Sequence, residues 1–334
     1  MRWVPVPVAI AASLAFAAPA FGHAAFAGSD PSAGARVETS PARVTLVFTE
    51  PLEQRLAKAT IERAGGGRVP AAQSFSPGGE RILLAPAQPL GTGAYVVHWH
   101  TVSDEDGHAL EGAFSFGVRA APGASAALET GPLARAGIAR ILARLALYVT
   151  LLTLVAALLG PLLVRRPAGW PVPDAVADDL AGGEATGAAG AGVDLANARG
   201  RYARLTGDLA WLAVAAAVAS ALADAADAAA GVNPSGISDF LLAGLPGAAR
   251  VAVVVALVAA ALLHARAPRV AAGAAVLALG ALAASGHAAA AEPRTPSILN
   301  DWLHLVSGAV WLGGIALLVL VWWPVLRFTS RATR

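Results

Sequence analysis

The chain has 334 residues, of which 56% are hydrophobic and 14% are charged, and its formal net charge is +2. Its mean hydropathy of +0.60 is too high for an ordinary soluble protein and indicates a membrane protein. The chain has no cysteine and one methionine, the initiator, so disulfides, iron–sulfur clusters and sulfur-based capture of Cu(I) are excluded, and a metal would need nitrogen and oxygen ligands.

Residues 1–22 have the features of a secretory signal peptide. Arg2 is the positive region, residues 8–18 are the apolar core, and Ala20-Phe21-Gly22 is a small-x-small cleavage site. The apolar core is short for a membrane-spanning helix, which favours cleavage after Gly22 over an uncleaved anchor. Cleavage would make His23 the first residue of the mature protein, and would offer its α-amine and imidazole as a bidentate chelate.

Residues 23–120 are predicted to form an Ig-like antiparallel β-sandwich. Short strand-like segments are separated by glycine and proline, and in the first of them Val44, Leu46 and Phe48 alternate onto one face. We expect strands at 43–48, 59–62, 68–70, 82–85, 94–102 and 113–118. Residues 121–141, which begin with a run rich in Ala, Gly and Pro, are predicted to be a tether.

Residues 142–326 are predicted to be an all-α transmembrane bundle of about five helices. Each apolar segment is close to the roughly 20 residues that a spanning helix needs. The segments lie at 142–164, 205–226, 249–265, 270–289 and 302–324. Residues 167–200 have low complexity and are predicted to be a disordered cytoplasmic linker.

The arginine distribution predicts the orientation of this multi-pass protein in the cell membrane. With the sandwich outside and the C-terminus in the cytoplasm, most arginines fall in inside loops. Five arginines depart from this rule because they fall on the outer side: Arg135, Arg140, Arg144, Arg250 and Arg294. Arginines beside apolar runs fit a lipid bilayer as the partner, and we expect no nucleic-acid partner.

The segment "TVSDEDGHALEG", residues 101–112, gathers carboxylates and a histidine in a chain with few charges. Asp106 and His108 are two residues apart, so an extended backbone could point both side chains the same way, and Gly107 permits a tight path between them. A carboxylate and an imidazole suit Cu(II), but a solvated turn explains the same spacing.

The other histidines divide between the two parts of the chain. In "YVVHWHTV" the alternation places Tyr95, Val97 and Trp99 in the core, so His98 and His100 are predicted to lie on the more exposed face and not to be primary ligands. His287 ends the fourth apolar segment and His304 begins the fifth. We expect these two to lie close together near the outer surface and to serve a copper path, although a histidine bonded to a nearby carbonyl is the alternative.

The motifs resemble two known families. Residues 23–118 are similar to the CopC copper-binding proteins through "HAAFAGSDPSAGA", "VTLVFTEPL" and "GAYVVHWHTVSDEDGHALEGAFSFGV". This resemblance implies Cu(II) ligands at His23, Asp106 and His108 and a weak one at Glu50. The loop is one residue longer here than is usual in the family, so Asp104 competes with Asp106 for the role of the carboxylate ligand. The remainder resembles a shortened CopD membrane domain through "ASGHAAA" and "DWLHLVSGAVWLGG".

The resulting prediction is that the protein binds Cu(II) outside the membrane and hands it over to the helical part, in copper resistance, homeostasis or uptake. It is not predicted to be an enzyme. The expected partners are the copper ion, the bilayer and other copper-handling proteins. Two alternatives remain. One is a histidine-brace copper oxidase or monooxygenase, which an anionic Asp106 would disfavour because it opposes cycling to Cu(I). The other is a metal-free, membrane-anchored interaction module.

Overall fold

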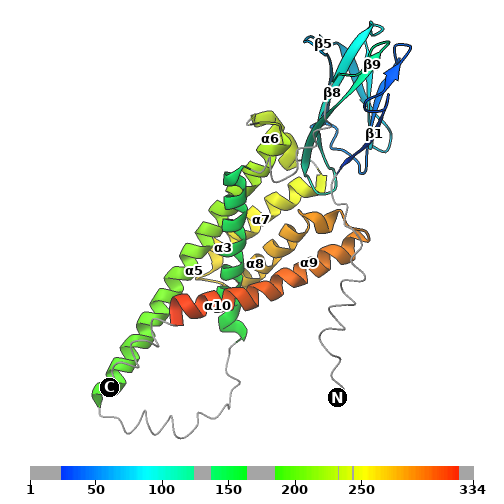
Figure 1. Cartoon of the computed structure of the whole chain (residues 1–334). Helices are drawn as coiled ribbons and strands as arrows, with labels where there is room; N and C mark the ends of the chain where they lie inside the picture. The colour runs from blue at the N-terminus through cyan, green and yellow to red at the C-terminus, as the bar shows by residue number, and fades with distance from the viewer. Residues whose placement is uncertain (1–23, 124–136, 164–184, 232, 243, 323–334) are drawn as a thin grey trace, which may run out of the picture.

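The structure is a computed structural model. Its described residues are 24–123, 137–163, 185–231, 233–242 and 244–322 (Figure 1). The predicted signal peptide, His23 and most of the predicted tether lie outside these residues. A β-sandwich is followed by a helical part, and the sandwich sits on one end of the helices.

Two sheets form the sandwich, as the sequence predicts. One has four strands in the order β1-β3-β7-β6, and the other has five in the order β2-β9-β8-β4-β5. The strands are β1 (Phe26–Asp30), β2 (Arg36–Val37), β3 (Val44–Phe48), β4 (Lys58–Arg63), β5 (Arg68–Val69), β6 (Ala71–Phe75), β7 (Arg81–Pro86), β8 (Gly93–Val102) and β9 (Ala109–Val118). All pairings are antiparallel except that of β2 with β9.

Alternating apolar residues build the core between the sheets. The predicted inward face of β3 is buried, and so are Tyr95, Val97 and Trp99 on β8. The ring of Trp99 meets that of Phe48 edge to face, with centroids 5.3 Å apart. The ends of β8 and β9 farthest from β2 point towards the helical part, which places the loop between these strands at the junction (Figure 1).

The helical part contains most of the apolar sequence. Its elements are α3 (Ile138–Leu163), α5 (Ala185–Ala228), α6 (Pro234–Leu242), α7 (Gly244–Leu263), α8 (Pro268–Ala283), η1 (His287–Ala289), α9 (Arg294–Gly308), η2 (Ala309–Gly313), α10 (Gly314–Leu317) and η3 (Leu318–Trp322). Four helical stretches are long and apolar enough to cross a membrane: Ile138–Leu162, Gly200–Ala228, Gly244–Leu263 and Arg294–Leu320. The other predicted span corresponds to α8, which has 16 residues and is shorter.

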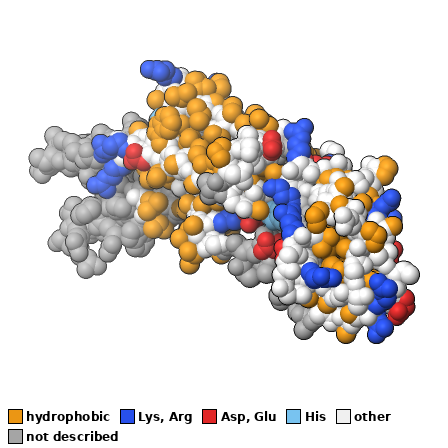
Figure 2. Space-filling model, turned by 90° about the horizontal axis from the view of Figure 1, so that it is seen from above, with side chains coloured by type: hydrophobic (Ala, Val, Ile, Leu, Met, Phe, Trp, Pro, Cys, Tyr) orange, Lys and Arg blue, Asp and Glu red, His pale blue; other side chains and the backbone are white. Residues whose placement is uncertain are grey.

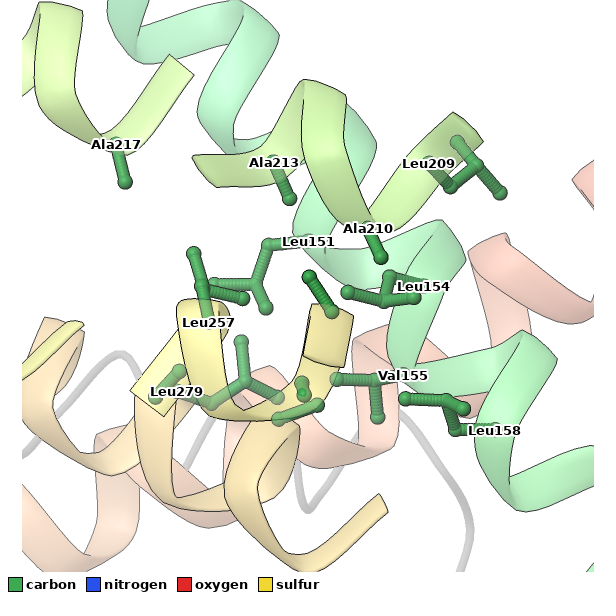
Figure 3. Packing of buried hydrophobic residues seen from close by; sticks show 14 of the residues in the cluster. Leu151, Leu154, Val155, Leu158, Leu209, Ala210, Ala213, Ala217, Leu257 and Leu279 are labelled. Atoms are coloured by element: carbon green, nitrogen blue, oxygen red, sulfur yellow. The ribbon is translucent and has the colours of Figure 1, made fainter. Parts of the chain in front are cut away.

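Leucines and alanines hold the helices together. Leu151 and Leu154 of α3 meet Leu257 of α7 and Leu279 of α8, and alanines of α5 lie beside them (Figure 3). Small side chains along these helices let their backbones approach closely, which favours packing between helices in a membrane.

Three local features differ from the sequence predictions. Residues 185–200, in the predicted disordered linker, form the first turns of α5, while residues 164–184 lie outside the described residues. The short helix α6 was not predicted, although Asn233 before Pro234 is a good helix start and its side-chain oxygen accepts the N–H of Gly236 at 2.6 Å. The π-helical segments η2 and η3 interrupt the last predicted span.

Candidate metal centre

The loop between β8 and β9 is a closed turn. The N–H of Ser103 donates to the carbonyl of His108, and the N–H of Gly107 donates to the carbonyl of Ser103, both at 3.0 Å. Gly107 has a φ of +73°, a left-handed conformation that glycine adopts without strain. The turn therefore fixes how the side chains on either side of Gly107 are aimed.

Asp106 and His108 form the centre of this loop. The Asp106 side chain is fully buried, and its Oδ1 accepts the backbone N–H of His108 at 3.0 Å. Its Oδ2 lies 2.8 Å from Nδ1 of His108. Asp104 is exposed, and its carboxylate points instead towards Gly244 at the start of α7. Of the two competing carboxylates, Asp106 is the one beside His108.

His287 reaches the same carboxylate from the helical part. Its Nδ1 lies 3.5 Å from Oδ2 of Asp106, and its ring stacks on that of His108 with centroids 4.8 Å apart and planes 8° apart. Donor atoms of Asp106, His108 and His287 all lie within 4.8 Å of one another. We call these three residues the junction cluster. Figure 2 shows histidine surface in the narrow region between the two parts, flanked by basic and acidic side chains.

The electrostatics of the junction cluster favour an ionised carboxylate. Burial by itself raises the pKa of Asp106, but hydrogen bonds from His108 and His287 and the charge of the His108 ring outweigh it and hold that pKa far below its ordinary value. A buried anion with two imidazoles beside it is a set of nitrogen and oxygen donors that a divalent transition metal can use.

Comparisons with known proteins match the sandwich. The model of the CopC domain family matches residues 26–119. Copper resistance protein C of Xanthomonas campestris pv. juglandis is 38% identical over 119 residues, which cover 34% of this chain and 91% of that protein. The chain belongs to the CopC family. A crystal structure of CopC from Methylosinus trichosporium OB3b is 28% identical, with a TM-score of 0.27, and covers 31% of this chain and 99% of that one.

A second relative has a shorter match. Copper transport protein CutJ of Bacillus subtilis (strain 168) is 56% identical over 41 residues, which cover 12% of this chain and 8% of that protein. Beyond the CopC domain, the chain continues into four membrane-length apolar helices.

The remaining predicted ligands of the CopC domain have different surroundings. Glu50 is buried and its Oε2 accepts the hydroxyl of Ser103 at 2.9 Å, so it supports the loop. Burial raises the pKa of Glu50, and the Ser103 hydroxyl opposes this shift. Glu50 is not in the junction cluster. His23 lies outside the described residues, but Ala25 near it is anchored, because its N–H donates to Oγ1 of Thr49 at 2.9 Å.

His304 does not join the junction cluster. Its side chain is exposed on α9, and among the described residues the metal-binding group beside Asp106 includes His287 but not His304. The expectation that His287 and His304 form one pair at the entrance thus finds no contact to support it. Among the described residues, His287 is the histidine of the helical part that reaches the CopC domain.

His98 and His100 differ from each other. His98 is exposed as predicted, with Nε2 3.9 Å from Glu62. His100 was predicted to be exposed, but it is buried, because the end of α5 covers it and its Nε2 lies 3.0 Å from the carbonyl of Ala228. The alternation along β8 correctly separates the two faces, but it carries no information on what covers the outer one.

Two ion-pair systems at the junction were not predicted. Arg294, the first residue of α9, lies 4.0 Å from Glu105 of the loop between β8 and β9, the candidate metal-site loop. Asp224 of α5 accepts hydrogen bonds from Arg140, Arg144 and Arg250 at 2.9 to 3.2 Å. Four of the five arginines that depart from the charge rule therefore have carboxylate partners. The sequence signal was Asp224 itself, an acid inside an apolar span.

Proposed function

We propose that this protein captures Cu(II) outside the cytoplasm with its CopC domain and passes the ion to its membrane part. The observation that carries the proposal is the buried Asp106 carboxylate with the imidazole of His108 2.8 Å away in a CopC domain. The CopC relative is named as a copper resistance protein, and a nitrogen–oxygen donor set in a chain without cysteine suits Cu(II).

In this proposal the new N-terminus completes the copper site. Cleavage after Gly22 gives His23 a free α-amine beside its imidazole. The chain just after it is held to the sandwich at Thr49, and the next residue, Glu50, is bonded to Ser103 of the metal-site loop. This chain of contacts supports a start of the mature protein next to Asp106 and His108. The ligands would be His23, Asp106 and His108, with Glu50 as a weak, peripheral contributor.

The hand-over step rests on where the two parts meet. The CopC domain docks on the end of the helical part that holds η1, so a copper ion in the loop is next to the mouth of the helical part. The 41-residue match to a protein named for copper transport supports a role in moving copper for the chain as a whole. With a cleaved signal peptide, this end faces outwards and the C-terminus lies in the cytoplasm.

Cu(II) titration of the full chain in detergent, with a native His23 terminus, tests the proposal. We expect one tightly bound Cu(II) per chain in competition with a chelator of known affinity. His108→Ala should weaken binding by at least about 100-fold, because a ligand and the partner of a buried carboxylate are lost together. His98→Ala, the exposed histidine of the same strand pair, should change nothing. Equal binding by wild type and His108→Ala would refute this copper site, and no binding by wild type would favour a metal-free interaction module.

A further inference from the structure

The junction cluster draws its donors from both parts of the chain. Asp106 and His108 belong to the CopC domain, whereas His287 opens η1, between α8 and α9. First-row divalent ions hold nitrogen and oxygen donors at about 2 Å, so neighbouring donors at a right angle are about 2.8 Å apart. Oδ2 of Asp106 is 2.8 Å from Nδ1 of His108 and 3.5 Å from Nδ1 of His287, and both separations lie between this value and the roughly 4 Å of donors on opposite sides of an ion.

His287 is held at this place by contacts around it. Arg294, seven residues later, donates through Nε to the carbonyl of Ala289 at 2.6 Å and reaches Glu105 at 4.0 Å. η1 is therefore linked to the metal-site loop on both sides of Asp106. The His287 side chain itself remains 62% exposed, so its ring has room to turn towards a metal.

The rest of the junction also fixes the loop on the helices. The buried apolar side chains of Leu56, Val102 and Ala109 pack against Ala228 and Phe240 of the helical part. These contacts, together with that of His100 at the end of α5, determine how the loop faces η1.

A cavity begins where the junction cluster ends. It has a volume of about 420 Å³ and is lined by His108 and His287, by Ser297, Asn300 and Asp301 of α9, and by the Asp224 ion pairs. The lining arginines, Arg144 and Arg250, are paired with Asp224, so the oxygen donors of α9 are the lining groups that suit a cation. A metal held by both histidines would lie at the mouth of this polar cavity.

We propose that His287 is a ligand to the same Cu(II) that Asp106 and His108 bind, so that the CopC domain and the helical part share one copper site at the mouth of the cavity. The inference rests on the proposed function and deepens it. Copper would then leave the CopC domain by ligand exchange. His287, its first ligand on the helical side, would already be bound before any ligand of the loop is released. Asp301 and Asn300 are the next oxygen donors inside.

Pulsed EPR of Cu(II) bound to the full chain counts the coordinated imidazoles directly. Wild-type protein with a native His23 terminus should give the pattern of three imidazoles, from His23, His108 and His287. His287→Ala should give two, and should weaken Cu(II) binding by at least about tenfold. His304→Ala is the matched control, because it removes an exposed histidine of the helical part outside the junction cluster, and it should keep three imidazoles and the wild-type affinity.

The outcomes separate this inference from the proposed function. If His108→Ala weakens binding while His287→Ala leaves the imidazole count and the affinity unchanged, the shared site is refuted and copper binding by the CopC domain stands. If neither variant changes binding, both proposals fail. Where a junction variant folds poorly, His23→Ala decides. A wild-type count of two that falls to one in His23→Ala overturns the shared site, because His23 and His108 then account for both imidazoles.

Discussion

The rings of His108 and His287 stack face to face, 4.8 Å apart, although 179 positions separate them in the chain and they belong to different parts of the fold. The carboxylate of Asp106 lies beside both rings. This relationship links a copper-binding family domain to a set of membrane-length helices through side chains that can bind metal. The junction between the two parts is therefore where the proposed hand-over of copper can be tested.

The first prediction concerns the N-terminus. An alanine inserted between Gly22 and His23, left in place after processing, should weaken Cu(II) binding by at least about tenfold, because the α-amine of His23 becomes an amide that binds metal only after a costly deprotonation. Chelator competition on the full chain measures the effect, with mass spectrometry of the terminus as the control. Equal affinity in the two proteins would remove His23 from the site.

The second prediction concerns the two competing carboxylates of the loop. Asp106→Asn should weaken Cu(II) binding by about tenfold or more, because it removes the anionic oxygen between the two histidines. Asp104→Asn is the matched control in the same loop, and its exposed side chain faces Gly244. Isothermal titration of both variants gives the comparison. A larger loss in the Asp104 variant contradicts the assignment.

The third prediction concerns the docking of the loop on the helices. A Cβ added at Gly107 would lie 3.0 Å from Pro246 and 3.1 Å from Phe240, both in the helical part. Gly107→Ala should lower the free energy of unfolding by about 1–3 kcal/mol, since it combines this crowding with a left-handed backbone. Gly79→Ala has nearly the same φ of +76° but no contact in the helical part closer than 4 Å, so it isolates the backbone effect. Thermal unfolding should show the smaller loss for Gly79→Ala. Equal losses would argue against close docking.

The fourth prediction concerns pH. The pKa of Asp106 is lowered from an ordinary value of 3.8, so this carboxylate is ionised throughout the neutral and mildly acidic range. Its contribution to stability is complete above about pH 4 and is lost only as the pH falls through the lower folded-state pKa. Loss of Cu(II) on acidification should therefore come from protons that compete with copper for the imidazole and amine ligands, and not from protonation of Asp106. Affinity measured between pH 4 and 8 checks this. An affinity that stays constant down to pH 4 would contradict it.

Much of the sandwich could be predicted from the sequence because strand periodicity is local. The alternation of Tyr95, Val97 and Trp99 is enough to identify the buried face of β8. The burial of His100 could not be predicted, because its cover, the carbonyl of Ala228, lies 128 residues later. The ion pairs of the outer arginines could not be predicted for the same reason. A count of charges by loop treats Arg250 as an exception, whereas the structure pairs it with Asp224 at 2.9 Å.

The candidate site could also be predicted only where it depends on local sequence. The spacing of Asp106 and His108 indicates a possible chelate, and the left-handed turn at Gly107 brings the two side chains to within 2.8 Å. The predicted topology places His287 at the outer end of a span, but its contact with Asp106 depends on how the CopC domain sits on the helices. His304 has a similar place in the sequence, yet its side chain lies outside the junction cluster. Side-chain direction at a junction between two parts of a fold is a tertiary property that residue spacing does not determine.

The most direct measurement is an anomalous difference map, recorded at the copper edge, from crystals of the copper-loaded full chain with a native His23 terminus. We predict a single strong peak at the junction cluster, about 2 Å from donor atoms of Asp106 and His108. A peak at another place, such as the exposed His98 beside Glu62, with none at Asp106, would contradict the central claim that this loop binds the copper.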